Sequence, residues 1–470
     1  MHGMTDPLRS LASRRPASVV ALVLATALTI AVAAAAMPPS ALARAGATAS
    51  AGAQTVAVNG AVRYQRIAGF GASEAFGEAE VIQNAPAATA RQALDLLFST
   101  SGGAGLTILR NEVSADPGTT IEPDAPASPA AAPAYLPLTS IADDQGQLWL
   151  TQTIKNDYHV TDVIADAWSA PAFMKTNDSV DNGGTLCGVP GAACASGDWR
   201  QAYANYLKQY AADYAAAGDP LRYVGPENEA NIGPGYDSML MSPDQTANLL
   251  EFLGPTMARS GLPTRAECCA TEGWDYAQQY AAAIEADPLA NAFTPLFTSH
   301  GYTEAPASPL AGWTRPVWET EWSTFQAWDP AWDDGTTASG LAWAQNIYAG
   351  LTAAGLNAFL YWWGSSTPTF NGDNESLIQI NGSTVSPSGR LWAFANYSRF
   401  VRPGAVRIGS SAPGGSLEVT AFRNRNGSVA IVVLNPATTA QQPAAAVRDG
   451  RFTATLPARS LVTYVIPASR

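Results

Sequence analysis

The stretch Val317-Trp318-Glu319-Thr320-Glu321-Trp322-Ser323 decides the fold of this chain. Two apolar residues open what we expect to be a buried strand, and two carboxylates then follow beside an indole. The stretch Tyr223-Val224-Gly225-Pro226-Glu227-Asn228-Glu229 has the same form, with a short apolar strand that ends in glutamates. Parallel barrels carry their functional side chains at such carboxyl ends of strands. The two stretches therefore predict two strands of one parallel barrel.

Around these stretches the sequence alternates between short apolar segments and helical patterns. The clearest helix is predicted over 199–217, with Asp198 as its N-cap and an aromatic stripe that we interpret as packing against the barrel. Eight strands alternating with helices indicate an α/β fold, a (β/α)8 TIM barrel, rather than an open sheet. The predicted strands are Arg66–Phe70, Leu106–Arg110, Asp162–Trp168, Leu221–Val224, Thr264–Cys268, Phe293–Ser299, Pro316–Thr320 and Asn357–Trp362.

The C-terminal part of the chain has a different pattern, with short alternating strands and turns such as Asn426-Gly427. This pattern predicts a small C-terminal β-sandwich side domain. An alternating stretch near the N-terminus, 56–62, could add a strand to it and make this domain discontinuous in sequence. We therefore expect a signal peptide at 1–45, a linker and joining strand at 46–65, the catalytic barrel at 66–400 and the β-sandwich at 401–470.

The N-terminus has the features of an export signal. Arg9, Arg14 and Arg15 precede an apolar run from Val19 to Met37, and small residues around 41–45 offer cleavage sites. The alternative is an uncleaved anchor, because a run of 19 residues is close to membrane-spanning length. The Ala-rich composition favours removal, so we expect a secreted protein that does not contact a membrane after processing.

Composition excludes several classes of function. The formal charge of −13 disfavours a nucleic-acid partner, whose binding depends on clustered Lys and Arg. Only three histidines are present, which disfavours a His-rich metal site and leaves few bases for a Ser-His-Asp triad. The 13 Trp and 16 Tyr residues suit a protein that stacks on neutral sugar rings, although most of them will be core.

The four cysteines should be oxidised in an exported protein. Cys187 and Cys194 flank a loop rich in Gly and Pro, and we expect them to close it with a disulfide. Cys268 and Cys269 are adjacent, so they are either a vicinal disulfide or two free buried thiols. Nothing near them in the sequence completes a set of metal ligands.

Two carboxyl groups at the mouth of a barrel can cleave a glycosidic bond. Retaining glycosidases place such groups about 5–5.5 Å apart, one protonated and the other ionised. Glu229 ends the fourth predicted strand and Glu321 the seventh, and these strands face each other across the mouth. Glu227 and Glu319 share the parity of their neighbours, but the outermost glutamate of each pair lies nearer the mouth. Asn228 could donate to a sugar 2-hydroxyl group.

The chain resembles glycoside hydrolase family 30 of clan A, whose fold is a (β/α)8 barrel with a side β-sandwich. The segments that carry the resemblance are Gly69–Phe76, Asn228-Glu229 and Thr320-Glu321-Trp322. The resemblance implies that Glu229 is the acid/base and Glu321 the nucleophile. One departure is Ala230, which stands where the family usually has Pro.

Within that family the chain is most similar to the endo-β-1,6-galactanases. Four segments carry this similarity: Trp168–Asn177, Gly183–Gly188, Ser196–Arg200 and Cys268–Trp274. The resemblance implies a secreted, retaining, monomeric endo-enzyme for β-1,6-galactan side chains of arabinogalactan, with no cofactor and no metal. The alternatives are a β-1,6-glucanase, xylanase or glucosylceramidase of the same family, or a non-catalytic carbohydrate-binding protein.

Further residues are expected around the two glutamates. Arg110 resembles the active-site arginine of the clan, and a cation there would keep Glu321 ionised. The alternative is an arginine that only ties loops together. Polar sugar contacts are expected from Glu74 and Glu272. Other side chains at strand ends could line the sugar subsites or be core: His300, Tyr302, Trp168, Trp274, Trp322 and Trp362.

Overall fold

The computed structural model describes residues 54–138, 144–368, 374–447 and 450–468, all within one compact unit, Ala51–Arg470. The predicted signal peptide at 1–45 and residues 46–53 of the predicted linker and joining strand lie outside the described residues. Within the described ranges, no helix is both long enough and apolar enough to cross a bilayer.

Nine strands pair in parallel in the order β6-β5-β4-β3-β2-β10-β9-β8-β7. The two ends of this order, β6 and β7, are consecutive pieces of chain separated only by Glu267, so the sheet closes as a barrel with eight strand positions. The predicted TIM barrel is thus confirmed. The strands are β2 (Gly69–Ser73), β3 (Ile108–Glu112), β4 (Asp162–Asp166), β5 (Tyr223–Gly225), β6 (Arg265–Ala266), β7 (Cys268–Thr271), β8 (Phe297–His300), β9 (Val317–Glu321) and β10 (Ala358–Ser366).

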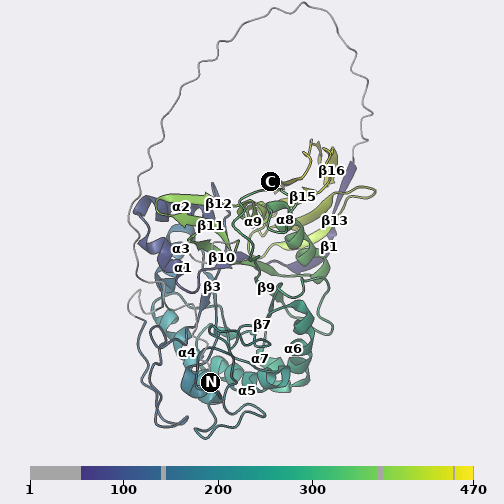
Figure 1. Ribbon diagram of the computed structural model, residues 1–470. Helices are drawn as coiled ribbons and strands as arrows, with labels where there is room; N and C mark the ends of the chain where they lie inside the picture. The colour runs from purple at the N-terminus through teal and green to yellow at the C-terminus, as the bar shows by residue number, and fades with distance from the viewer. Residues whose placement is uncertain (1–53, 139–143, 369–373, 448–449, 469–470) are drawn as a thin grey trace, which may run out of the picture. The chain divides into compact units, whose positions relative to one another are not determined.

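Helices follow most of the barrel strands and cover the outside of the barrel (Figure 1). α5 begins at a capping box, in which Ser242 and Gln245 exchange side-chain and backbone hydrogen bonds. The helices are α1 (Glu78–Asn84), α2 (Ala87–Phe98), α3 (Gln147–Tyr158), α4 (Arg200–Ala216), α5 (Pro243–Arg259), α6 (Trp274–Ala286), α7 (Pro288–Phe293), α8 (Gly340–Ala349) and α9 (Gly389–Ser398), with a 3-10 turn at Ala172–Met174 and a π turn at Gly350–Ala354.

Helix α4 confirms one prediction and corrects another. Its aromatic stripe is buried against the barrel, with Tyr203, Tyr206 and Tyr214 all at 0% exposure. The predicted N-cap, Asp198, stands one residue too early, because Trp199 occupies the cap position without a capping side chain. Asp198 still accepts a hydrogen bond from the Arg200 backbone N–H at 3.1 Å, so it satisfies one of the free donors at this end.

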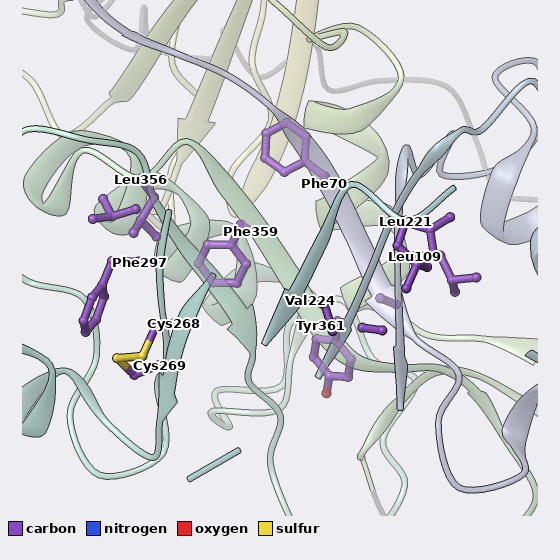
Figure 2. Packing of buried hydrophobic residues seen from close by; sticks show 14 of the residues in the cluster. Phe70, Leu109, Leu221, Val224, Cys268, Cys269, Phe297, Leu356, Phe359 and Tyr361 are labelled. Atoms are coloured by element: carbon purple, nitrogen blue, oxygen red, sulfur yellow. A yellow bond between two sulfur atoms is a disulfide. The ribbon is translucent and has the colours of Figure 1, made fainter. Parts of the chain in front are cut away.

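Residues of the barrel strands alternate between two buried layers. One layer fills the barrel interior, where Ile108, Tyr223, Trp318 and Leu360 pack together, and the Tyr223 and Trp318 rings meet edge to face at 5.7 Å. Their strand neighbours face the helices. Figure 2 shows part of this second layer, including Leu109, Val224, Phe359 and Tyr361. Burial on both faces explains why the strands read as continuous apolar runs.

A second sheet has the order β17-β16-β1-β13-β14-β15-β18 and corresponds to the predicted β-sandwich domain. The strand expected near the N-terminus is β1, which pairs with β13 antiparallel and with β16 parallel. Figure 1 shows β1, in purple, beside these late strands. The strands are β1 (Gln54–Arg66), β13 (Val406–Ser411), β14 (Glu418–Arg423), β15 (Val429–Asn435), β16 (Pro443–Val447), β17 (Gly450–Thr453) and β18 (Ser460–Ile466).

One hairpin was not expected from the sequence. Strands β11 (Ser376–Asn381) and β12 (Thr384–Pro387) pair antiparallel, and β11 extends the barrel sheet beside the long strand β10. The hairpin matters for the site because it places residue 375, directly before β11, next to the carboxyl half of β10.

Candidate active site

A β-bulge at the end of β9 separates the roles of its two glutamates. Glu319 lies opposite Ser299 of β8 and Glu321 lies opposite His300, so two residues of β9 match one residue of β8. Trp318 faces the barrel interior, and Glu319 therefore faces outward, where Trp274 Nε1 donates to it at 2.7 Å. The extra residue turns Glu321 back toward the mouth. The expectation that the two glutamates share one face is wrong for this reason.

The glutamates after β5 also diverge. β5 ends at Gly225, so the prediction that this strand ends in glutamate is wrong, and both side chains belong to the loop that follows. Glu227 is buried, where it accepts the Thr246 hydroxyl at 2.8 Å. Glu229 has a left-handed backbone, with φ of 47°, and its N–H donates to Ala270 O at 2.7 Å. This bend directs the two side chains to different places.

Glu229 and Glu321 meet at the mouth of the barrel with His300 between them. One ligand atom from each of these three side chains lies within 4.8 Å of the others. His300 Nδ1 is 2.9 Å from Glu229 Oε1, and its Nε2 is 3.8 Å from Glu321 Oε2. The hydroxyl of Tyr302 donates to Glu321 Oε1 at 2.8 Å. The two carboxyl groups are thus close enough to act on the same bond.

Arg110 is fully buried next to this pair and donates to three different side chains. Its Nη1 donates to Glu321 Oε2 at 2.5 Å, its Nε to Asp166 Oδ2 at 2.6 Å and its Nη2 to Asn228 Oδ1 at 2.6 Å. The guanidinium also lies over the Trp168 ring, 4.5 Å from its centroid. Asn228 therefore uses its side-chain oxygen as the acceptor for Arg110, and its amide N–H groups are not used in this bond.

The surroundings give the two carboxyl groups different affinities for a proton. Burial, and then the charge of Glu321, raise the pKa of Glu229 well above its ordinary value. Burial also raises the pKa of Glu321, but Arg110 and the hydroxyl of Tyr302 oppose this rise. Burial and Arg110 hold the pKa of His300 well below its usual range, so this imidazole is neutral. The first proton of the pair therefore belongs to Glu229, and Glu321 is the carboxylate.

A cavity of about 330 Å³ opens above the pair. It brings together Glu229 and Glu321 with four other side chains that the sequence predicted: Trp168, Glu272, Tyr302 and Trp362. The remaining wall residues, which the sequence analysis did not single out, are Phe76, Ile232, Tyr236, Phe325, Trp363 and Glu375.

The wall of this cavity does not include six of the predicted substrate-binding residues. Arg110, Asn228 and His300 instead contact the two glutamates or each other. Glu74, Trp274 and Trp322 contact other neighbours. Glu74 is 1% exposed and accepts from the Ser365 hydroxyl at 3.0 Å. The indole N–H of Trp274 donates to Glu319 at 2.7 Å. Trp322 packs edge to face on Trp343, with ring centroids 5.2 Å apart. Each of these last three side chains contacts a neighbour inside the fold, which residue type and position at a strand end cannot reveal.

Two exposed aromatic rings are the most informative of the missed wall residues. Phe325 is 66% exposed and stacks on Tyr302, with ring centroids 5.5 Å apart. Tyr236 is 50% exposed. Both rings follow a predicted catalytic glutamate by four to seven residues in a loop, and this spacing is the signal that could have found them. Exposed aromatic rings at a cavity rim offer platforms for ring-shaped ligands.

Both predicted disulfides are present. Cys187 and Cys194 are bonded with their Cα atoms 5.5 Å apart, and Cys268 is bonded to Cys269 across a cis peptide bond (Figure 2). The alternative of two free buried thiols is therefore wrong. The vicinal pair begins β7, and Cys268 Sγ lies 3.6 Å from Glu227 Oε1. Bonded sulfurs are not available as metal ligands, which leaves Glu229, His300 and Glu321 as the one group at the mouth with ligand spacing among the described residues.

Arg110 argues against a cation at that group. Its guanidinium already neutralises Glu321 at 2.5 Å, and a metal ion placed there would be repelled by it. One protonated and one ionised carboxyl group close together are the pair that retaining glycosidases use. A parallel barrel with such a pair at its carboxyl edge, beside a separate β-sheet domain, has the architecture of a glycoside hydrolase.

Comparison with known proteins gives the family. The model described as O-Glycosyl hydrolase family 30 matches residues 53–307, and the model described as Glycosyl hydrolase family 30 beta sandwich domain matches residues 404–464. The chain belongs to glycoside hydrolase family 30. It is therefore a glycosidase whose substrate is a carbohydrate.

Several members of the family are similar over most of this chain. The solved catalytic domain of GH30 xylanase C from Talaromyces cellulolyticus is 41% identical, with a TM-score of 0.82 over 88% of this chain and 100% of that one. The endo-1,6-beta-D-glucanase neg1 of Aspergillus fumigatus is 23% identical, over 86% of each chain. The endo-1,6-beta-D-glucanase BGN16.3 of Trichoderma harzianum is also 23% identical, over 86% of this chain and 84% of its own.

Proposed function

We propose that this chain is a retaining endo-glycosidase in which Glu321 is the nucleophile and Glu229 the acid/base. The observation that carries the proposal is the closeness of the pair, because one carboxyl oxygen of Glu229 lies within 4.8 Å of one carboxyl oxygen of Glu321. Retaining enzymes use a separation of about 5–5.5 Å, whereas inverting enzymes need roughly 6.5–9.5 Å to admit a water. The order of protonation agrees with these roles.

The reaction runs in two steps. Glu321 Oε attacks the anomeric carbon and forms an ester, while Glu229 gives its proton to the departing glycosidic oxygen. Glu229 then takes a proton from water, whose oxygen attacks the same carbon and releases Glu321 as a carboxylate. Arg110 and Tyr302 hold Glu321 in line for the first attack. Because the ester carries no charge, the pKa of Glu229 falls between the steps and suits it to act as a base.

Replacement of each glutamate tests the two roles. Glu321→Ala should abolish turnover, and azide should restore it with inverted product stereochemistry. Glu229→Gln should keep the first step on an aryl glycoside whose leaving group needs no proton, and should lose activity on the natural glycan. Glu319→Gln and Glu227→Gln are matched controls, because both are buried outside the cavity. Azide rescue of a Glu319 variant instead of Glu321→Ala would overturn the assignment.

For the substrate we propose β-1,6-galactan, cleaved inside the chain. The support is the likeness of the segments Trp168–Asn177 and Cys268–Trp274 to endo-β-1,6-galactanases. A 1,6-linkage adds a rotatable bond between sugar rings, so the glycan is flexible and needs separate platforms. The compact cavity, with aromatic walls on several sides and the polar groups of Glu272 and Tyr236, suits such a ligand. A polar group that meets the axial O4 of galactose would reject its epimer, because the group would be left unpaired.

The competing specificities are xylan and β-1,6-glucan. Xylan is favoured by the 41% identity to a protein named as a xylanase, and β-1,6-glucan by the two curated glucanases. Hydrolysis of β-1,6-galactan, xylan and β-1,6-glucan at matched concentration separates the three. Release of short β-1,6-galacto-oligosaccharides, with little action on the other two, is the expected result. Preference for either competitor would refute the substrate while leaving the two glutamates in their roles.

We also propose that the protein is secreted as a monomer after removal of residues 1–45. The support is the basic, apolar and small-residue pattern of the N-terminus. The intact mass of the exported protein would show where the chain is cut, and its elution in size-exclusion chromatography would report the oligomeric state. Retention of the whole chain in the membrane fraction would favour the uncleaved anchor.

A further inference from the structure

Glu267 lies at the seam of the barrel, between β6 and β7, and takes no part in the proposed reaction. Its side chain is fully buried, and its backbone N–H donates to Val224 O at 3.0 Å. The Thr298 hydroxyl, from β8, donates to its Oε2 at 2.6 Å. A buried carboxyl group of this kind is costly unless its other oxygen is also satisfied.

The other oxygen of Glu267 faces a second buried carboxyl group, that of Asp166. Asp166 Oδ1 and Glu267 Oε1 both lie against Gly225, at 2.2 and 2.3 Å from the point where a Cβ would stand. Since both oxygens lie this close to one point, they are at most 4.5 Å apart. Neither oxygen accepts a hydrogen bond from an N–H or hydroxyl group within the described part of the chain. Two carboxyl oxygens in this contact need a proton between them.

The proton belongs to Glu267 because Asp166 has a cation and Glu267 has none. Arg110 Nε donates to Asp166 Oδ2 at 2.6 Å. Burial, followed by the charge of Asp166, raises the pKa of Glu267 well above its ordinary value. The titratable or charged groups that face Glu267 are Asp166 from β4 and Arg110 from β3, and only the second of them opposes this rise.

We propose that Glu267 is a positioning residue whose protonated carboxyl donates to Asp166 and so holds Arg110 against Glu321. The chain of contacts runs from Glu267 Oε1 to Asp166 Oδ1, from Asp166 Oδ2 to Arg110 Nε, and from Arg110 Nη1 to Glu321 Oε2. Each link fixes the orientation of the next, because a carboxylate held at both oxygens cannot rotate. This contact between Glu267 and Asp166 requires a glycine at position 225, since any side chain there would displace both oxygens.

Two substitutions separate hydrogen bonding from packing. Glu267→Gln keeps the size of the side chain, donates to Asp166 through its amide and accepts from Thr298, so its kcat should stay within about threefold of wild type. Glu267→Met fills the space without a donor. It should lower kcat on an activated aryl glycoside by roughly tenfold to a hundredfold with little change in KM, because a hydrogen bond to a charged group is lost.

The pH profile should also respond to Glu267→Met. Without this donor, Asp166 can rotate and holds Arg110 less firmly against Glu321. Arg110 opposes the rise in the pKa of Glu321, so a displaced Arg110 lets that pKa climb. The acid limb of kcat/KM should therefore move to higher pH, whereas Glu267→Gln should leave it in place. A Glu267→Met enzyme with the wild-type rate and profile would show that the residue only packs. Equal losses in both variants would show that the donated bond is not what matters.

Infrared spectroscopy tests the proton directly and needs no substrate. The difference spectrum of wild type minus Glu267→Gln at neutral pH should contain one carbonyl band of a protonated carboxylic acid. The inference rests on the proposed role of Glu321, but this measurement does not, so the two can fail separately. Absence of that band would mean that Glu267 is ionised and would overturn the proposal, even if the Met variant does not fold.

Discussion

Replacement of Arg110 by Met removes the one guanidinium that contacts Glu321 in the part of the chain that the structure describes. The change leaves Glu321 and Asp166 buried without the donors that now lie 2.5 and 2.6 Å from them. Breaking a buried ion pair from one side costs roughly 3–5 kcal/mol. If most of this cost falls on the first transition state, kcat/KM should drop roughly a hundredfold to several thousandfold.

The pH dependence of Arg110→Met has a definite sign. Burial raises the pKa of Glu321 and Arg110 opposes that rise, so its removal lets the pKa climb further. Glu321 must be ionised to attack, and the acid limb of kcat/KM should therefore move to higher pH. A carboxyl group whose folded-state pKa is raised favours the folded state at low pH and loses this contribution as pH rises. The variant should accordingly melt closest to wild type at acidic pH.

Arg110→Lys is the matched control because it keeps the positive charge but not the planar guanidinium group with its several N–H donors. A lysine ammonium is a point charge on a flexible stem and cannot donate to three fixed acceptors at once. We expect an intermediate loss of kcat/KM, with the acid limb close to its wild-type position. Initial rates on an aryl glycoside across pH, with melting curves for all three proteins, provide the measurement. An unchanged acid limb in Arg110→Met would refute the reasoning.

Two further predictions concern single contacts. Tyr302→Phe removes the hydroxyl that donates to Glu321 at 2.8 Å, so kcat/KM should fall roughly tenfold to a hundredfold, and a smaller effect than twofold in steady-state kinetics would contradict it. The double change of Cys187 and Cys194 to Ser opens a loop with a sequence separation of 7, which should lower the free energy of unfolding by roughly 2–3 kcal/mol in denaturant titration. An unchanged midpoint would contradict it.

Much of the barrel could be predicted from the sequence because its strands are buried on both faces. Segments such as Leu106–Arg110 and Pro316–Thr320 contain adjacent apolar residues (Ile108-Leu109 and Val317-Trp318), and such neighbours are found where one strand layer packs inside the barrel and the other under helices. The β11–β12 hairpin was missed for the opposite reason. Its pairing is decided by contact with β10, which lies beyond the window of any local pattern.

The positions of the two proposed catalytic side chains depend on backbone irregularities that a pattern cannot show. Period-two alternation puts Glu319 and Glu321 on one face, yet a bulge in β9 separates them. Alternation likewise joins Glu227 to Glu229, yet β5 ends before both, and Glu229 has a left-handed backbone. The outermost glutamates were nevertheless the ones that reached the cavity, because the mouth of a barrel lies beyond the last ladder bond.

The sequence alone does not show which charged side chains contact the two proposed catalytic glutamates, and the reason is electrostatic. A sequence shows that Arg110, Asp166 and Glu267 follow apolar segments, but it does not show which of them meet. Four carboxyl groups, those of Asp166, Glu229, Glu267 and Glu321, share the carboxyl edge of the barrel with Arg110. One guanidinium cannot balance four charges at low dielectric, so some of these groups must hold protons.

The contacts with Arg110 decide which of the four carboxyl groups hold protons. Asp166 and Glu321 form ion pairs with Arg110, whereas Glu229 and Glu267 do not contact it and keep their protons. Because Glu229 does not contact Arg110, it keeps a proton that it can donate in the proposed reaction. For the same reason Glu267 keeps a proton, with which it can form the proposed hydrogen bond to Asp166. In the proposed reaction, the conversion of Glu321 into an ester removes a negative charge beside Glu229. This lowers the pKa of Glu229, which burial and that charge together had raised.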